Sequence, residues 1–141
     1  MPQSLEKIEN FLNKHHVLTL ATFHADEVSA CSLFYAYAKE DISFVVASSE
    51  DTTHIQNIRK NEHIAGNIYL ETKEIGKIQG VQFKGKFLEC EDKKLKNLYF
   101  KHFPYALALA PKLWQIKVSF FKMTDNRVGF GKKVIWNASS L

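Results

Sequence analysis

The chain has 141 residues, 45% of them hydrophobic and eleven of them phenylalanine, and its formal net charge is +4. This length predicts one domain over residues 1–141. A chain of this size buries about two-thirds of its unfolded surface, so intrinsic disorder is excluded. The two cysteines, Cys31 and Cys90, lie far apart and exclude a disulfide framework. No apolar run approaches the ~20 residues that span a bilayer, so we expect a cytoplasmic protein with no membrane partner.

The first half of the chain combines helical and strand periodicities. Residues 4–16 predict an amphipathic helix with Leu5, Ile8 and Leu12 on one face. Runs of β-branched and apolar residues then predict strands, separated by turns at "HADE" and "KED". A second helix, capped by Thr52, precedes a further strand. The strands are predicted over 17–23, 28–38, 42–47 and 63–70, and the second helix over 52–61.

The second half opens with residues 78–90, which alternate with the period of a half-buried strand. Phe83 lies on one face of this strand, and Gln82 and Lys84 lie on the other. Gly85 in the middle predicts a bulge, a bend or a close neighbour. The remaining predicted elements are a helix over 91–103 capped by Asp92, and strands over 113–124 and 127–136 joined by a tight turn at Asp125 and Asn126.

Six or seven strands with short connections and about three helices predict a mainly β fold. The arrangement that fits is a barrel-like antiparallel sheet with peripheral helices. The alternating βαβ rhythm of a doubly wound fold is absent, which argues against a Rossmann-type nucleotide site.

A cluster of hydrogen-bonding side chains follows the predicted strand 42–47 and enters the predicted helix: Ser48, Ser49, Thr52, Thr53 and His54. Phosphate groups are bound by converging hydroxyls and by the free N–H groups and partial positive charge of a helix N-terminus. The cluster therefore predicts a phosphate site. An ordinary helix cap with additional polar loop residues explains the same pattern, because serine and threonine favour such positions.

The basic residues are nearly all lysines, spread along the chain, with arginine only at positions 59 and 127. The segment "QFKGKF" (82–87) combines basic and aromatic residues, as RNA-binding strands do. Its phenylalanines lie on the face opposite the lysines, however, and are expected in the core. The pI of about 9.0 favours nucleic-acid binding, but the position of the phenylalanines makes this a weak interpretation of the function. The histidines show no metal-binding spacing, and no metal site is predicted.

Three passages resemble a known family: "GVQFKGKF" (80–87), "HFPYALALAPKLWQIKV" (102–118) and "FKMTDNRVGFGKKVIW" (121–136). The chain is similar to the pyridoxamine 5′-phosphate oxidase-like FMN-binding split barrels, and within them to the YhbP-like bacterial branch. The resemblance implies a six-stranded antiparallel split barrel. It also implies a homodimer with FMN at the subunit interface.

The resemblance also implies where FMN would bind. The phosphate would lie on the Ser48–His54 cluster, where the family usually places cationic residues and this chain has Thr53 and His54. The second strand would run along the isoalloxazine ring, and Gln82 would replace the family's glutamine, whose position is Gly80 here. The implied cofactor-binding residues are Ser32, Phe34, Tyr35, Ser48, Ser49, Thr52, Thr53, His54, Gln82, Lys84, Lys132 and Lys133.

The function implied by the resemblance is a flavin-dependent oxidoreductase with a small-molecule substrate. Counterparts of the arginine and histidine residues that hold pyridoxal phosphate in true oxidases are missing, so oxidation of pyridoxamine phosphate is not expected. The alternative is a non-enzymatic binding protein for haem or another planar ligand, whose acidic groups the histidines and Lys132 and Lys133 would suit.

Overall fold

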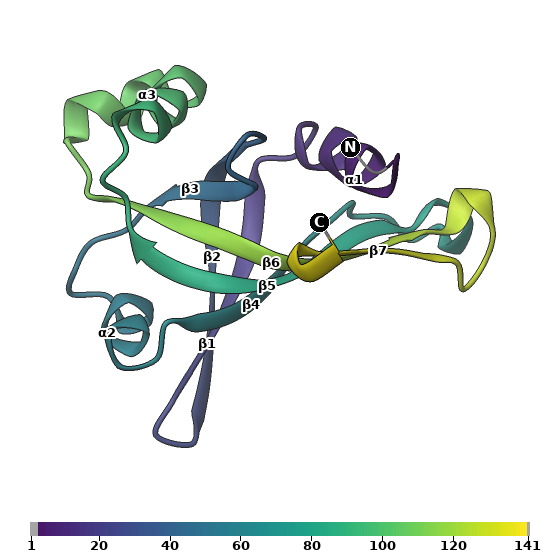
Figure 1. The fold of residues 1–141 in the computed structure, drawn as a ribbon, viewed down its shortest axis with the longest axis horizontal. Coiled ribbons are helices and arrows are strands. Elements are labelled where there is room, and N and C mark those ends of the chain that lie inside the picture. Colours follow the sequence, from purple (N-terminus) through teal and green to yellow (C-terminus); the bar gives the residue numbers. More distant parts are fainter. Residues whose placement is uncertain (1–2, 141) are drawn as a thin grey trace.

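The computed structural model describes residues 3–140, which form three α-helices and seven strands (Figure 1). The helices are α1 (Gln3–Leu12), α2 (Thr53–Lys60) and α3 (Lys93–His102). The strands are β1 (Val17–His24), β2 (Glu27–Ala38), β3 (Ser43–Ala47), β4 (His63–Tyr69), β5 (Gln79–Glu89), β6 (Leu113–Asp125) and β7 (Lys133–Asn137). No helix within residues 3–140 is long and apolar enough to cross a membrane.

The seven strands form one antiparallel sheet that closes into a barrel. The strand order is β3-β2-β1-β4-β5-β6-β7, and β3 also pairs with β6. This additional pairing runs from Ser43 opposite Lys117 to Ala47 opposite Leu113. It closes the first six strands of the chain into a ring. The seventh strand, β7, pairs with the other half of β6. The predicted antiparallel barrel is confirmed, with one strand more than the six that were expected.

The last two strands depart from the prediction. In place of a tight turn at Asp125 and Asn126, a 3₁₀ turn η3 (Asn126–Val128) and a loop precede β7. The buried Asp125 carboxylate causes this difference, because it accepts hydrogen bonds from the Arg127 backbone N–H and guanidinium, at 2.8–3.1 Å. The final strand therefore begins at Lys133 rather than at residue 127, and Lys132 lies in the loop before it.

A β-bulge interrupts the pairing of β5 with β6 at the predicted position. Lys84 is opposite Phe120 and Gly85 is opposite Val118, so Ser119 has no partner on β5. A Cβ atom on Gly85 would lie 2.2 Å from the backbone oxygen of Lys117. Gly85 therefore marks both a bulge and a close approach of two backbones.

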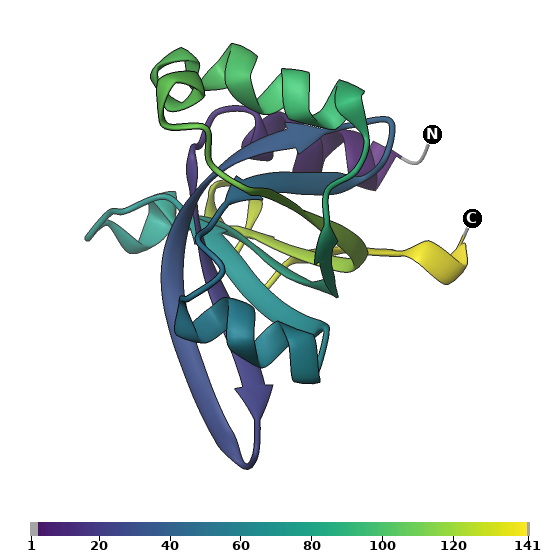
Figure 2. The same ribbon diagram turned by 90° about the vertical axis from the view of Figure 1, so that its left-hand side faces the viewer.

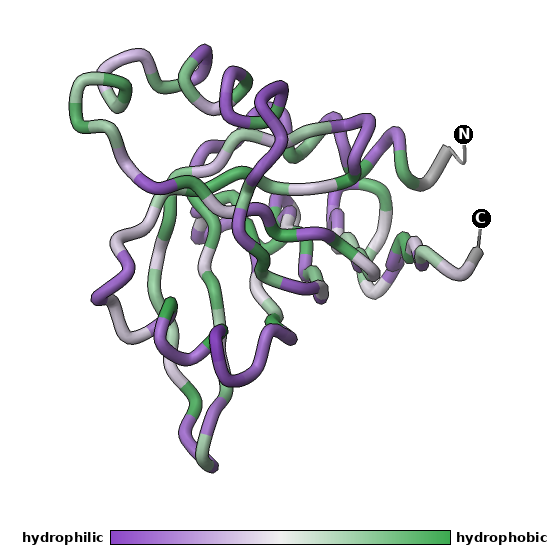
Figure 3. The backbone as a smooth tube through the Cα atoms, turned by 60° about the vertical axis from the view of Figure 1, so that its left-hand side comes forward, coloured by the Kyte–Doolittle hydropathy of each residue, from purple (hydrophilic) through white to green (hydrophobic). Residues whose placement is uncertain are grey.

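The barrel interior and two helices form one core. Alternate residues of most strands point inward, and Figure 3 shows many hydrophobic residues (green) along the strands of the barrel. Ile8 of α1 and Ile55 of α2 are fully buried in this core, although Figures 1 and 2 show the two helices well apart. Tyr35 donates a 2.7 Å hydrogen bond to the backbone oxygen of Leu12, which fixes the end of α1 against the sheet. Each fully buried aliphatic side chain contributes about 1.5–3 kcal/mol by leaving water.

Helix α3 packs on the outside of the barrel. Leu95 and Tyr99 of this helix contact Ala36 and Val45, which point outward from β2 and β3. The predicted cap is confirmed, because Asp92 accepts a 2.8 Å hydrogen bond from the backbone of Lys94. Helix α3 covers only the part of β2 that pairs with β3. The outer face of the first half of β2 therefore stays uncovered by α3.

Replacing Gly85 with alanine is expected to lower the free energy of unfolding by about 1–3 kcal/mol, because the new methyl group meets backbone atoms that cannot rotate away. Urea unfolding followed by circular dichroism measures the change. Gly76→Ala is the matched control, since nothing lies within 4 Å of the place its methyl group would take, and its effect should stay within about 0.5 kcal/mol. Equal unfolding midpoints for the two variants would contradict the close approach.

Candidate functional site

An uncovered outer face extends across β1, β2, β4, β5 and β6. The strand registers place polar side chains of neighbouring strands side by side on it. Thr19 pairs with Ser32 on one side and with Asn67 on the other, and Asn67 pairs with Gln82. Directly opposite side chains on an antiparallel sheet have Cβ atoms about 4.5–5.5 Å apart. A row of four neutral hydrogen-bonding groups thus crosses four strands.

Small residues lie next to this row and leave hollows in the face. Ala21 pairs with Ala65 on the neighbouring strand. A hollow of about 310 Å³ is lined by Thr19, Ala21, Ala65, Gly66, Asn67, Gln82, Phe83, Lys84 and Phe120. A second hollow of about 420 Å³ shares Thr19 and Asn67 with the first and adds Ser32. The outer face therefore offers a shallow floor with polar groups along one side.

Lys84 and Phe120 bound the first hollow. The Lys84 Nζ atom lies 5.3 Å from the centroid of the Phe120 ring, within the range of a cation–π contact. The amine is exposed to solvent and forms no salt bridge within residues 3–140. Lys84 follows Gln82 by two residues on β5, so its side chain points to the same face.

Large apolar side chains are exposed on the same outer face. They lie at both ends of β1, on β2 and β4 beside it, and on β7, and they point away from the core. They are Val17, Phe23, Val28, Phe34, Tyr69 and Ile135, with exposed fractions of 46–73%. Val17 is directly opposite Phe34, and Phe23 is directly opposite Val28, so these side chains form apolar pairs. Exposed apolar surface of this kind is typical of interaction sites.

The hydroxyl cluster lies where β3 leaves the sheet. Val46 pairs with Tyr35, so the following residues leave β3 beside the part of β2 that carries Ser32 and Phe34. The Ser48 hydroxyl is 2.6 Å from the Nε2 atom of His54, and Ser48 is buried.

Thr52 forms the predicted helix cap within the same cluster. Its hydroxyl donates a 2.9 Å hydrogen bond to the backbone oxygen of Ser49 and accepts one of 3.4 Å from the backbone N–H of Ile55. Ser49 and Thr53 are exposed. The cluster can therefore both cap helix α2 and bind a phosphate. Thr52 forms the cap, while Ser49 and Thr53 remain exposed beside the helix N-terminus.

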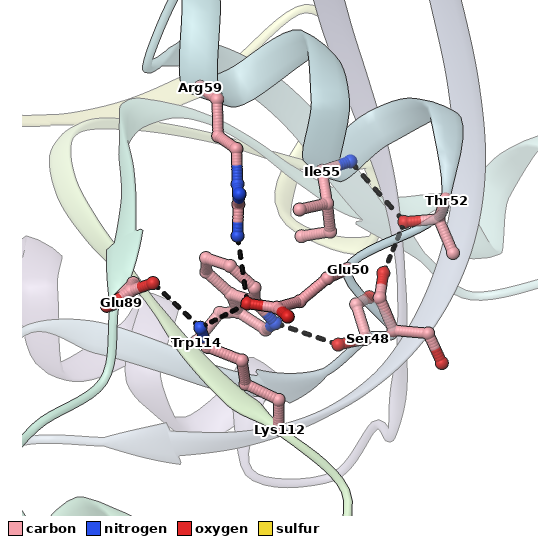
Figure 4. Close-up of polar contacts among 9 residues, drawn as sticks. Ser48, Glu50, Thr52, Ile55, Arg59, Glu89, Lys112 and Trp114 are labelled. Atoms are coloured by element: carbon pink, nitrogen blue, oxygen red, sulfur yellow. Dashed lines mark hydrogen bonds and ion pairs between the residues drawn. The ribbon is translucent and has the colours of Figure 1, made fainter.

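A network of charges fixes the loop between β3 and α2 (Figure 4). Lys112 donates hydrogen bonds to Glu50 at 2.6 Å and to Glu89 at 2.7 Å, and Arg59 contacts Glu50 at 2.9 Å. The buried Trp114 donates a 2.9 Å hydrogen bond to the backbone oxygen of Ser48, and the Lys112 amine lies 4.8 Å from its ring centroid. Hydrogen bonding to Lys112 lowers the pKa of Glu50, so this carboxylate is ionised at neutral pH.

His54 is the titratable member of the cluster. Burial lowers the pKa of its imidazole below the ordinary value of 6.5, so the ring is neutral at pH 7. A neutral imidazole has one unprotonated nitrogen, which can accept a hydrogen bond from the Ser48 hydroxyl. His54 therefore acts on a ligand as a neutral group unless binding itself raises its pKa.

The structure brings together two groups of the predicted site residues. Ser32, Gln82 and Lys84 share the outer face, while Ser48, Ser49, Thr52, Thr53 and His54 form the cluster at the end of β3. Phe34 is exposed beside them, with its ring centroid 5.6 Å from that of Phe103. No side-chain hydrogen bond joins the two groups among the described residues.

Three of the predicted residues lie elsewhere. Tyr35 points into the core and is 2% exposed, so its side chain does not line the outer face. The cause is strand alternation, which turns Tyr35 inward between the outward Phe34 and Ala36. Lys132 and Lys133 were expected on one strand, but Lys132 precedes β7 and Lys133 begins it. Both are exposed, and nothing in the described part of this single chain connects them to the cluster.

Two features of the site were missed by the sequence reasoning. Asn67 stands at the centre of the polar row but looks like any exposed residue of an alternating strand. Lys112 and Trp114 reach the cluster from a segment more than 50 residues away, and only the pairing of β3 with β6 brings them there. The outward alternation of β4 was a usable signal for Asn67, whereas no local pattern indicated Lys112.

Comparison with solved structures identifies the fold as a split barrel. A heme binding protein from Mycobacterium smegmatis matches with a TM-score of 0.81 and 15% identity, over 99% of this chain and 60% of the other. A FAD-binding protein from Mesorhizobium loti gives 0.72 and 15%, over 84% and 90%. A Listeria innocua protein provisionally named a pyridoxamine 5′-phosphate oxidase gives 0.70 and 15%, over 89% and 99%. At such identities the likeness concerns the fold alone.

Sequence relatives define the family more closely, although no family model matches the chain. The UPF0306 protein YhbP of Escherichia fergusonii is 36% identical over 141 residues, which cover 98% of this chain and 96% of YhbP. A UPF0306 protein of Photorhabdus laumondii is 34% identical over 137 residues, 95% and 96% of the two chains. The chain belongs to the UPF0306 (YhbP) family, which confirms the predicted branch.

The lowered pKa of His54 predicts that acid destabilises the protein through this residue. As the pH falls below about 6.5, the unfolded chain takes up the proton before the folded protein does, so stability present above that pH is lost. His54→Gln, which keeps a hydrogen-bonding group beside Ser48, should lose less stability between about pH 7.5 and about pH 5. Urea unfolding at both pH values measures this. Burial also lowers the pKa of His15, but this residue is present in both the parent and the variant, so its contribution cancels in the comparison. Equal losses would show that His54 does not contribute.

Proposed function

We propose that this protein binds FMN as a homodimer and is a flavin-dependent oxidoreductase that acts on a small molecule. The observation that carries the proposal is the outer face of the barrel. It combines small residues, a row of neutral hydrogen-bonding groups and exposed apolar side chains, and it adjoins a hydroxyl cluster at a helix N-terminus. Flat aromatic cofactors bind to sites of this composition.

The isoalloxazine ring would lie on the outer face. The floor of Ala21 and Ala65 admits a flat ring, and Ser32 and Gln82 supply hydrogen bonds along its edge. Lys84 would place a positive charge beside the ring. Phe34 would extend the apolar wall at the end nearest the cluster.

The phosphate would lie at the cluster that follows β3. The N-terminus of α2 offers backbone N–H groups, and the first turn of this helix contains no acidic residue that would repel an anion. Ser49 and Thr53 are exposed there. Because Arg59 and Lys112 are both bound to Glu50, additional positive charge would come from Lys84, or from Lys132 and Lys133 of the second subunit.

The exposed apolar residues support the homodimer. Stable subunit interfaces bury about 1,200–2,000 Å² in total, with an apolar core and a polar rim. Val28, Phe34 and Tyr69 are each at least 59% exposed on the face that carries the polar row. Covering this face with a second copy would remove these side chains from water and enclose a ligand that lies on it.

When bound, FMN would supply hydride or electron transfer, while the protein supplies position and electrostatics. Gln82 and backbone groups of β2 would orient the ring. Lys84 would stabilise negative charge on it. The apolar side chains of the two subunits would exclude water from the ring, which strengthens these electrostatic effects.

FMN binding is expected when the protein is titrated and flavin fluorescence is followed. Lys84→Ala should weaken FMN by about ten- to a hundredfold, the effect of losing one charge-assisted contact of about 1.5–3 kcal/mol. The double variant Thr53→Ala, His54→Ala should weaken FMN but leave riboflavin unaffected, because riboflavin has the ring and lacks the phosphate. The complex should sediment as a dimer.

The control for Lys84→Ala is Lys117→Ala, which removes an exposed lysine from β6 that lines none of these hollows. This variant should bind FMN like the parent. If the double variant retained the parent's affinity for FMN, the proposed phosphate site would be wrong, and if the Lys84 variant did so, Lys84 would not contact the cofactor. If FMN failed to bind the parent at all, the proposed function would be wrong.

Haem is a second candidate ligand, favoured by the position of His63. This exposed histidine begins β4 and lines a hollow of about 290 Å³ together with Ala21, Phe23, Val28, Ala65 and Lys84. Imidazole is a common axial ligand of haem iron, and apolar walls suit the porphyrin. The M. smegmatis neighbour named a heme binding protein has the same fold, which supports considering this ligand.

Haem titration followed by absorbance tests this candidate. Binding through His63 predicts a sharp Soret band that His63→Ala shifts and weakens by at least about tenfold in affinity, because the axial bond is lost. His24→Ala is the matched control, since it removes an exposed histidine from the end of β1. Equal spectra for the parent and both variants would exclude His63 as the ligand.

A further inference from the structure

We propose that Asn67 and Gln82 act as a pair that recognises the imide edge of a flat heteroaromatic ring, the carbonyl–NH–carbonyl edge of a pyrimidinedione. The proposal rests on the proposed function and deepens it, because it names the chemical group that selects the ligand. It assigns a specificity role to Asn67, a residue that neither the motifs nor the family resemblance indicated.

The position of Asn67 is the first observation. Three hollows adjoin on the outer face, and Asn67 lines all of them. Gln82 lines two of the three, and Gly80, which has no side chain, leaves the third open beside both amides. A ring lying in any of these three hollows would therefore have an edge near Asn67.

The register of the strands is the second observation. Asn67 of β4 is directly opposite Gln82 of β5, and both side chains point outward. Their Cβ atoms are therefore about 4.5–5.5 Å apart. Thr19 stands on the other side of Asn67 and adds a hydroxyl to the same row. Two carboxamides at this spacing can address neighbouring atoms of one ligand edge.

The hydrogen-bonding capacity of the pair matches an imide. Each amide offers one oxygen acceptor and two N–H donors. One amide oxygen can accept from the ring N–H, while the amide N–H groups donate to the carbonyls on either side of it. Both residues are neutral, so recognition depends on this pattern and not on charge.

Both amides are also free to bind a ligand. Asn57 donates its amide to Thr22 and Asn61 donates to the backbone of Phe23, so these amides hold α2 against β1. Asn67 and Gln82 have no such hydrogen bonds with any residue between positions 3 and 140, and both are exposed. Their substitution should therefore leave folding intact.

Fluorescence titration with three probes tests the pair: riboflavin, FMN and N3-methylriboflavin, which lacks the imide N–H. Asn67→Leu and Gln82→Leu should each weaken riboflavin and FMN by the same factor of about ten, since the phosphate is not involved. The parent should bind N3-methylriboflavin about tenfold more weakly than riboflavin, and Asn67→Leu should abolish that difference. Asn67→Asp, which keeps an acceptor but loses the donor, should weaken riboflavin and FMN yet retain the preference for riboflavin over N3-methylriboflavin.

The matched control is Asn97→Leu, which removes an exposed amide from α3 and should bind all three probes like the parent. Thermal unfolding of each variant confirms that it is folded. If the parent binds FMN but the Asn67 and Gln82 variants bind riboflavin equally well, the pair is refuted and the proposed function stands. If the parent binds neither flavin, both proposals are overturned.

Discussion

The pairing of β3 with β6 is the constraint on which the rest of the structure depends. Five residue pairs join these strands and convert an open sheet into a ring. The same pairing brings Leu113 opposite Ala47, so the chain leaves β3 next to Trp114 and Lys112. The tryptophan and the lysine then hold the following loop by its backbone and by Glu50. The hydroxyl cluster has a defined shape because the barrel is closed.

Much of the fold could be predicted from local patterns, because each pattern reports a local physical requirement. The cap at Thr52 follows from the free N–H groups at a helix start, and Gly85 marks a place where no side chain fits. Closure of the ring could not be predicted in this way. It depends on which strands meet, and a strand's alternation reveals its faces but not its neighbours.

The same limit explains the partial success with the site. The hydroxyls after β3 are contiguous in sequence, so the sequence alone indicated them. Asn67 becomes part of a polar row only through its pairing with Thr19 and Gln82 on adjacent strands. The resemblance indicated a segment of β2 rather than one of its faces, and Tyr35 belongs to the inward face. The interpretation of the last strand failed because the hydrogen bonds of buried Asp125 reshape the turn.

The bulge at Ser119 separates the half of β6 that pairs with β3 from the half that pairs with β7. Before it, the inward residues of β6 are Trp114, Ile116 and Val118; after it they are Phe121 and Met123, so the parity changes once. A regular ladder in which Ser119 paired with β5 would turn the second half of β6, with β7, inside out. Ser119 is the extra residue that the bulge accommodates, so the residues on either side of it keep their side chains on the correct faces of the barrel wall.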